Sequence, residues 1–422
     1  MGRLTALEGY SGSGSAPGGS EVWTSVPAVP VEAGSRPFIP PERGRAVSDG
    51  SVRPGGLEGA ILGPSGISHP EGREGRLWYR GFDATELALR LPYGSIAYLL
   101  IWGEPPASDP PPEIEEGFRA GRALAQRALP ILELLPPGTP PLDALRTGLS
   151  ALGDGRFEYP PQRDRGVWLA GAIAELLGSW HRLRAGASVD EDPAGSHLDR
   201  YLAQTATLPA TPERRRALAV YAGLLADHGM NPSTFALRVV LSTRSDLVSA
   251  FGAALGALKG PAHGGAPAEV SAFLDEIGQV DRIDSVIADR LQRGGRIPGF
   301  GHRTYRVEDP RSVVLHRLAR TVARADRLRL AEETEAAARD ALGRTHPGRG
   351  LFPNVDYYGA LVLEGVGLAP EWFTPTFAVA RSVGWVAHAL EQAGRNRLIQ
   401  PEFEYDGPPP RAWPRRFPDP TP

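Results

Sequence analysis

Four of the nine histidines lie in unusual sequence settings. They are His228 in ADHGMN, His263 in GPAHGGAP, His302 in GFGHRTYR and His388 in VGWVAHAL. His263 precedes a Gly-Gly-Ala-Pro run that predicts a helix start, and the positive end of a helix dipole favours a neutral imidazole. Such an imidazole can donate a hydrogen bond to a developing enolate oxygen. A histidine that only caps backbone groups in a glycine-rich turn is the alternative, and the motif alone favours it.

A second glycine loop carries His302. The glycines of PGFGH allow the backbone to approach a ligand closely, and Arg303 adds positive charge beside the imidazole. Arg311 follows in Asp309-Pro310-Arg311. We therefore predict an anion-facing loop, although glycine loops also form plain turns.

Arg381 lies on an apolar helical stripe. Its neighbours at three- and four-residue spacing are Phe377, Ala378, Gly384 and Trp385. A guanidinium there must find an anion or carry a large desolvation penalty. A bound carboxylate and an internal Asp or Glu satisfy this requirement equally well. His388, two turns further along the stripe, is predicted to be a hydrogen-bonded core residue.

Asp356 lies in LFPNVDYYGA, behind a predicted helix cap at Asn354 and among aromatic residues. A carboxylate near a helix start usually only complements the helix dipole, and the sequence alone favours this interpretation. The alternative is a partly desolvated general base.

Several site classes are excluded or disfavoured by the residues. The chain has no cysteine, which excludes a disulfide framework, a thiolate nucleophile and sulfur-ligated metal sites. It has no HExxH motif and no histidine pair at three- to five-residue spacing, so we predict no metal. It also lacks GxxxxGK[ST], a GxGxxG run after a strand and GxSxG, which disfavours nucleotide-binding and α/β-hydrolase functions.

The elements that must position these residues are predicted to be helices, and the fold class is all-α. Apolar residues recur at three- and four-residue spacing over residues 85–91, 113–129, 166–183 and 212–226. Helix starts are predicted at Asn231-Pro232, Asp309-Pro310 and Thr374-Pro375. The segment 246–258 is rich in Gly and Ala, which suits a tightly packed core or a subunit interface. The best strand signal is LWYRGF at 77–82.

Length and composition limit the remaining possibilities. The 422 residues carry a net charge of −3, which gives no electrostatic footprint for nucleic acid or an anionic membrane. Residues 1–53 are rich in Gly, Ser and Pro and are predicted to be a disordered extension, and residues 407–422 a flexible Pro-rich tail. No run reaches the roughly 18 apolar residues of a spanning helix, and no signal peptide is evident, so we expect a cytoplasmic protein.

Five separated motifs together resemble the citrate synthase family, in its order and spacing. They are ADHGMNPSTFALRVVLST, GPAHGGAPAEV, GFGHRTYRVEDPRS, PNVDYYGALVL and TPTFAVARSVGWVAHALEQ. The segment GLEGAILGPSGISHPEGREGRLWYRGFDATELA also resembles the family's opening segment. The resemblance covers residues 55–406.

The resemblance implies an all-helical homodimer without metal or other cofactor. A large domain (residues 54–258 and 366–406) and a small domain (259–365) would close over acetyl-CoA and oxaloacetate, which the family condenses before it hydrolyses the citryl thioester. By match to the motifs, Asp356 would abstract the methyl proton, His263 would stabilise the enolate and His302 would polarise the ketone. Oxaloacetate carboxylates would be held by Arg311, Arg381, His228 and Asn231. Arg303 and Arg306 would contact phosphates of coenzyme A.

One position departs from the family pattern. The family's C-terminal motif reads Asn-Arg-Ile-Ile-Arg-Pro-Arg, and its second Arg reaches the neighbouring subunit's oxaloacetate, whereas this chain has Gln400 at that position. A lost charge-assisted hydrogen bond to a buried carboxylate is worth roughly 1.5–3 kcal/mol. Either Arg397 or Arg395 replaces it from the same loop, or the acceptor is another 2-oxo acid.

Two further functions stay open at this point. A 2-methylcitrate synthase would take propionyl-CoA, and one methylene in a pocket is worth only about 1–3 kcal/mol, which motifs do not reveal. A catalytically silent relative would bind coenzyme A thioesters without releasing coenzyme A.

Overall fold

Helices make up most of the fold, for which a computed structural model describes residues 57, 59–187, 195–402 and 405–411. The predicted extension over residues 1–53 and most of the predicted tail over residues 407–422 lie outside the described residues. The all-α prediction is confirmed, with one small sheet as the exception. No helix of the described part of the chain is long and apolar enough to cross a membrane.

The sheet is a meander of three short antiparallel strands near the start of the described chain. The strands are β1 (Ser68–Glu71), β2 (Arg76–Tyr79) and β3 (Phe82–Asp83). The predicted strand over residues 77–82 is therefore divided between β2 and β3, because the chain turns at Arg80 and Gly81, both of which have positive φ. Ser68 pairs with Tyr79 across β1 and β2, and the side chains of both residues hydrogen-bond to Asp227, in the loop that follows α8.

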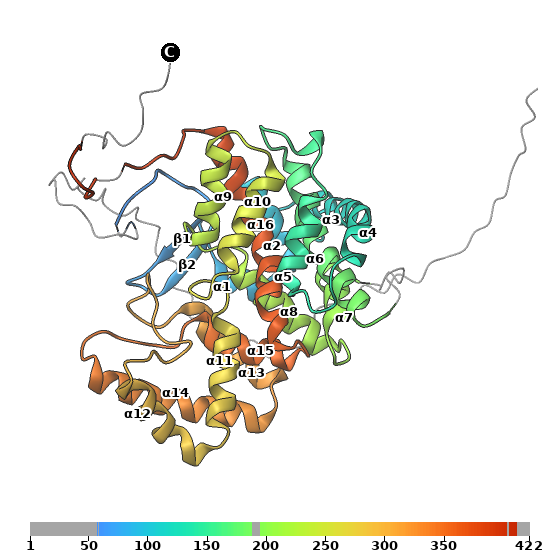
Figure 1. The fold of residues 1–422 in the computed structure, drawn as a ribbon. Helices are drawn as coiled ribbons and strands as arrows, with labels where there is room; N and C mark the ends of the chain where they lie inside the picture. The colour runs from blue at the N-terminus through green and yellow to red at the C-terminus, as the bar shows by residue number, and fades with distance from the viewer. Residues whose placement is uncertain (1–56, 58, 188–194, 403–404, 412–422) are drawn as a thin grey trace, which may run out of the picture. The chain divides into compact units, whose positions relative to one another are not determined.

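Ten helices between residues 84 and 258 form the larger group (Figure 1). They are α1 (Ala84–Arg90), α2 (Tyr93–Trp102), α3 (Pro112–Ala125), α4 (Leu129–Glu133), α5 (Pro141–Ser150), α6 (Arg163–Arg184), α7 (His197–Thr205), α8 (Pro212–Leu225), α9 (Pro232–Ser242) and α10 (Leu247–Leu258). The helices predicted over 85–91, 166–183 and 212–226 correspond to α1, α6 and α8. The helix predicted over 113–129 ends earlier, because a 3-10 turn at Gln126–Ala128 separates α3 from α4.

Five later helices gather at the other end of the fold in Figure 1. They are α11 (Ala266–Ile277), α12 (Ile283–Gln292), α13 (Pro310–Val322), α14 (Ala325–Thr345) and α15 (Val355–Gly365). All of them fall within the predicted small domain over residues 259–365. The last helix, α16 (Phe373–Gly394), returns to the larger group and packs against α2, α6, α8 and α9.

Capping side chains fix most of the helix starts next to the candidate residues. Asn231 accepts a hydrogen bond from the Thr234 N–H and starts α9, and Asp309 and Asn354 do the same for α13 and α15. The cap predicted at Thr374 is wrong. Helix α16 begins at Phe373 after a 3-10 turn, and the Thr374 hydroxyl donates instead to the Gly264 carbonyl at 2.7 Å.

A close approach of α16 to the end of α8 determines where the site residues lie. A Cβ atom on Gly384 would stand 2.2 Å from the Ala226 carbonyl oxygen and 2.7 Å from Oδ1 of Asp227. Only glycine fits such a distance without a shift of the backbone. Arg381 and His388, one turn before and after Gly384, are thereby brought against the loop that follows α8.

Candidate functional site

The loop between α8 and α9 carries the first predicted histidine. Nε2 of His228 lies 3.2 Å from the Tyr305 hydroxyl, and its ring lies edge-on to the His302 ring with centroids 5.3 Å apart. Burial, together with the charge of Arg311, holds the pKa of His228 well below its ordinary value. His228 is therefore a neutral imidazole at pH 7.

The His302 loop fixes the orientation of its imidazole through the backbone. Nδ1 of His302 accepts hydrogen bonds from the N–H groups of Thr304 (2.9 Å) and Tyr305 (3.1 Å). Because Nδ1 is an acceptor, the proton of the neutral ring sits on Nε2. Burial and the nearby Arg311 charge lower the pKa of His302 to about 4, so Nε2–H is available as a neutral donor.

Arg311 lies beside this donor but is already paired. Its Nε and Nη2 donate to the two carboxylate oxygens of Asp309 at 3.0 and 2.8 Å, and both side chains are buried. Nη2 also lies 3.4 Å from Nε2 of His302. Since both atoms carry hydrogens, they do not hydrogen-bond to each other, and two donors lie close together here. Arg311 is therefore paired with an internal acid, and the anion-facing role of this loop stays a prediction.

Asp356 is close to the Arg311–Asp309 pair, at the start of α15. Oδ2 of Asp309 accepts from the Val355 N–H at 3.2 Å, and the loop of His302 is tied to the same helix start by Asn354, whose Nδ2 donates to the Gly301 carbonyl at 3.0 Å. The Asp356 carboxylate makes no hydrogen bond within the described residues. Desolvation raises its pKa from 3.8 to about 7, against the lowering effect of Arg311. This is the value of a general base at neutral pH.

His263 lies on the other side of the site, in the turn that leads to α11. The predicted helix start is confirmed, because α11 begins at Ala266. Nε2 of His263 lies 2.9 Å from the Ser233 hydroxyl, and its ring lies edge-on to Phe377 at 6.0 Å. Burial, and then the charge of Arg381, lowers the pKa of His263 to about 4. The ring is thus neutral and oriented by Ser233.

Arg381 is 1% exposed, and its guanidinium lies against the end of α8. Nε donates to the Leu225 carbonyl at 2.6 Å, at the end of α8, and the guanidinium carbon lies 4.8 Å from the centre of the Phe377 ring. Nη1 is buried without a hydrogen-bond partner, and within the described chain no Asp or Glu forms an ion pair with Arg381. A buried cationic donor without a hydrogen-bond partner is costly, so Nη1 is a candidate anion-binding atom. The buried Asp227 carboxylate is the internal acid whose charge stabilises the guanidinium.

Not every predicted residue joins this group. The two Nδ2 hydrogens of Asn231 are both engaged, by the Gly229 carbonyl (3.2 Å) and the Thr234 hydroxyl (2.9 Å), so its amide serves the α9 cap and we no longer assign it to a carboxylate. Arg303, Arg306 and Gln400 are exposed. In the described structure no hydrogen bond joins His263 to His302 or Asp356. The charge of Arg381 lowers the pKa of both His228 and His263.

Sequence reasoning missed three residues of this site. Ser233 orients His263, the hydroxyl of Tyr305 contacts His228, and Phe377 separates His263 from Arg381. Ser233 and Tyr305 stand two and three residues from the predicted Asn231 and His302, so their nearness in sequence was the available signal. Phe377 was identified only as part of an apolar stripe.

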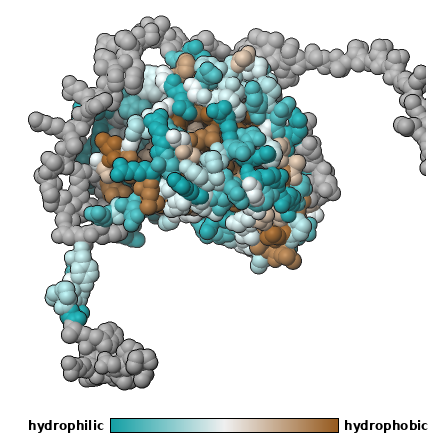
Figure 2. Space-filling view, turned by 90° about the horizontal axis from the view of Figure 1, so that it is seen from above, coloured by the Kyte–Doolittle hydropathy of each residue, from teal (hydrophilic) through white to brown (hydrophobic). Residues whose placement is uncertain are grey.

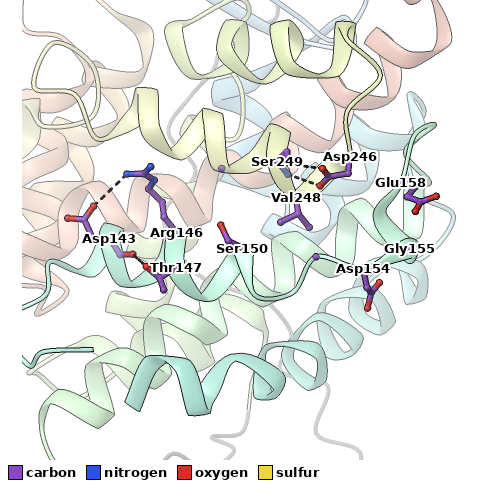
Figure 3. A pocket seen from close by; sticks show the side chains of 12 residues that line it. Asp143, Arg146, Thr147, Ser150, Asp154, Gly155, Glu158, Asp246, Val248 and Ser249 are labelled. Atoms are coloured by element: carbon purple, nitrogen blue, oxygen red, sulfur yellow. Dashed lines mark hydrogen bonds and ion pairs between the residues drawn. The ribbon is translucent and has the colours of Figure 1, made fainter. Parts of the chain in front are cut away.

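A separate hollow lies away from these residues. It has a volume of about 1070 Å³ and lies between α5 and α10, where Asp143, Arg146, Asp154, Glu158 and Asp246 are among its lining residues (Figure 3). None of the predicted site residues lines it. Among the described residues, no group of three or more His, Asp or Glu side chains is arranged to hold a metal ion.

The fold is helical, and the site combines neutral imidazoles, a carboxyl group of raised pKa and a buried guanidinium with an unpaired Nη1. The chain matches the family model described as "Citrate synthase, C-terminal domain" over residues 56–402. The chain belongs to the citrate synthase family.

Individual relatives agree with this assignment. The chain is 34% identical to a citrate synthase of Deinococcus radiodurans, with 83% of this chain and 95% of the relative aligned, and 31% identical to a 2-methylcitrate synthase of Shewanella oneidensis, with 84% and 95% aligned. Among solved structures, citrate synthase from Thermotoga maritima has a TM-score of 0.76 at 33% identity, covering 85% of this chain and 97% of that one. A ternary complex of Thermoplasma acidophilum citrate synthase with carboxymethyl coenzyme A and oxaloacetate has a TM-score of 0.77 at 26% identity, with the same coverage.

Proposed function

We propose that the protein condenses acetyl-CoA with oxaloacetate to give citrate and coenzyme A. The Arg381 guanidinium, which is buried with an open Nη1, is the observation that carries this proposal, because it requires an anion next to a set of neutral imidazoles. A substrate carboxylate meets that requirement. The solved relative that holds oxaloacetate and a coenzyme A analogue supports the same pair of substrates.

In the proposed reaction Asp356 takes a methyl proton from acetyl-CoA. A carboxylate with a pKa of about 7 is a stronger base than an ordinary one and is still half ionised at pH 7. The electron pair of the C–H bond moves into the thioester carbonyl, and His263, neutral because its pKa is about 4, donates a hydrogen bond to the resulting enolate oxygen.

The enolate carbon then attacks the ketone of oxaloacetate. We place the ketone oxygen where Nε2–H of His302 and Nη2 of Arg311 converge, so that both donors stabilise the alkoxide that forms there. Water then hydrolyses the citryl thioester, which releases citrate and the thiol of coenzyme A. Arg381 and His228 are proposed to bind carboxylate, and the exposed Arg303 and Arg306 to contact coenzyme A phosphates.

Release of free thiol from acyl-CoA tests the proposal. We expect release with acetyl-CoA and oxaloacetate, and much less with pyruvate or 2-oxoglutarate. A preference for propionyl-CoA would assign the alternative that the relative from Shewanella suggests, a 2-methylcitrate synthase. Binding of acyl-CoA without thiol release with any 2-oxo acid would refute catalysis. The Asp356→Asn protein is the matched control, because it should bind oxaloacetate and release no thiol.

The domain closure and the homodimer are also proposals. On α10, added Cβ atoms at Gly252 and Gly256 would meet open space, and the neighbouring Ala253 is partly exposed, so another helix can approach this face closely. Seen from above, apolar residues form separate patches on a mostly hydrophilic surface (Figure 2). We expect twice the chain mass in analytical ultracentrifugation, and a leucine at Gly256 should shift the protein towards the monomer. A monomeric wild-type protein would contradict this proposal.

A further inference from the structure

A line of buried polar side chains connects the His228 loop with the C-terminal end of α16. Its members, in order, are Ser68, Asp227, His388, Arg238 and Glu391. Asp227 and His388 are fully buried, and the side chains of Arg238 and Glu391 are 7% and 10% exposed. Buried groups of this kind persist only when each one is paired, so the line acts as a unit.

His388 is the central member, and its neighbours fix its protonation. Nε and Nη2 of Arg238 both point at Nδ1 of His388, at 3.0 and 2.6 Å. Because a guanidinium only donates, Nδ1 must accept, and the ring proton sits on Nε2. Nε2 lies 3.2 Å from the Asp227 carboxylate and donates to it. His388 therefore connects the Arg238 guanidinium to the Asp227 carboxylate.

At one end, Asp227 shapes the loop that carries His228. One carboxylate oxygen accepts hydrogen bonds from the Ser68 hydroxyl of β1 and from the Gly229 N–H (3.1 Å), so that the residues before and after His228 are joined. The Tyr79 hydroxyl donates to the Asp227 carbonyl at 2.9 Å. Asp227 also packs against Gly384, one turn from Arg381. A shift of this carboxylate would thus move both proposed carboxylate ligands.

At the other end, the line reaches the segment before Gln400. Glu391 accepts a hydrogen bond from the Gly66 N–H at 2.9 Å and pairs with Arg238. Nη1 of Arg238 donates to Gln392 at 3.3 Å. Gln392 in turn donates to Asn396 at 3.1 Å, and the backbone N–H of Ile399 is held by the Ser242 hydroxyl at 3.0 Å.

We propose that His388 is a positioning residue for the acceptor subsite, which transmits the placement of Arg238 to Asp227 and so holds His228 and Arg381 where the 2-oxo acid binds. This inference rests on the proposed function. His388 touches no substrate. Its loss acts on the acceptor and leaves the coenzyme A side, where His263 and Asp356 lie, largely unchanged.

Three substitutions test the proposal. His388→Leu removes both the donor and the acceptor. His388→Gln keeps an amide N–H for Asp227 and a carbonyl oxygen for Arg238. His197→Leu is the matched control, because His197 is also a buried histidine (4% exposed) but stacks on Phe118 at 4.0 Å, away from the line.

We expect His388→Leu to raise the KM for oxaloacetate at least about tenfold, because one good hydrogen bond is lost. The KM for acetyl-CoA should change less than about threefold. His388→Gln should restore the KM for oxaloacetate to within about threefold of wild type. His197→Leu should lower the melting temperature without changing either KM. A folded His388→Leu protein with an unchanged oxaloacetate KM would overturn the proposal.

Ser68→Ala covers the case in which His388→Leu does not fold. It removes the other side-chain donor to Asp227, from a partly buried strand position, and it should raise the oxaloacetate KM selectively. Equal changes in both KM values would overturn the positioning role. A wild-type protein that turns over no 2-oxo acid would instead refute the proposed function. In that case, calorimetric titration of oxaloacetate into the wild-type and His388→Leu proteins still decides whether His388 supports dicarboxylate binding.

Discussion

Replacing Asp356 by Asn should stabilise the fold at alkaline pH while it abolishes turnover. The pKa of Asp356 is raised from 3.8 to about 7 by desolvation, so the folded state binds its proton more tightly than the unfolded chain does. Stability from this group is therefore complete below pH 3.8 and is lost as the pH rises through 7. Each pH unit between the two pKa values is worth about 1.4 kcal/mol, which gives up to about 4 kcal/mol. Because Asp356 is partly accessible to water, we expect about 1–3 kcal/mol.

Denaturant unfolding at pH 5 and pH 8 measures this effect. The Asn variant should exceed wild type by about 1–3 kcal/mol at pH 8 and by less at pH 5. The wild-type rate should fall below pH 7 as the base becomes protonated. Equal unfolding free energies at both pH values, together with a rate that falls only near pH 4, would refute the assignment of Asp356 as a desolvated base.

Asp227→Asn is the control, because we expect it to change the stability at pH 8 in the opposite direction. Although burial alone would raise the pKa of Asp227, His388 and Arg381 hold it at about 2, below its usual 3.8. A depressed pKa means that the carboxylate stabilises the fold above pH 3.8 and loses this effect as the pH falls through 2. Asp227→Asn should accordingly be less stable than wild type at pH 8, where Asp356→Asn is more stable.

Four further changes have defined outcomes. Arg381→Gln should raise the oxaloacetate KM about 10- to 100-fold and leave the acetyl-CoA KM unchanged in steady-state assays, as one charge-assisted hydrogen bond is lost. Ser233→Ala should lower kcat about tenfold with little effect on the oxaloacetate KM, because it frees the His263 ring; an unchanged kcat would show that Ser233 does not orient it. Gly384→Ala should lower the melting temperature by several degrees, because overpacking costs about 1–3 kcal/mol of stability. An unchanged melting temperature would contradict the close contact with Ala226. Gln400→Arg should tighten oxaloacetate binding in calorimetry about tenfold, whereas no change would mean that another residue already serves this carboxylate.

The sequence predicted the local elements of the site well, because their signals are local. Asn231, Asp309 and Asn354 each precede a helix and cap it, and the chemistry of a cap depends on residues within one turn. The cap predicted at Thr374 is wrong because the partner of this residue is not local. Its hydroxyl found a distant partner, Gly264, which no short window of sequence contains.

Partners distant in sequence were the part that could not be predicted. The sequence left open whether Arg381 meets an internal acid. In the described core its Nε donates to the Leu225 carbonyl, and its charge interacts with the buried Asp227 carboxylate without a hydrogen bond between them. His388 was correctly predicted to be a hydrogen-bonded core residue, but Asp227, its partner, is separated from it by 161 positions. Arg311 was predicted to face an anion, and the Asp309 next to it takes two of its donors.

One dry environment can give the site both a base and neutral donors. Desolvation raises the pKa of Asp356 to about 7 and lowers those of His263 and His302 to about 4, because it disfavours the charged form of each group. Water that reached these side chains would reverse the order of their pKa values, since an exposed Asp titrates near 4 and an exposed His near 6.5. At pH 6 the carboxylate would then be a weak base and the imidazoles largely cationic. A substitution that only exposes these side chains to water should therefore reduce turnover even when each of them is intact.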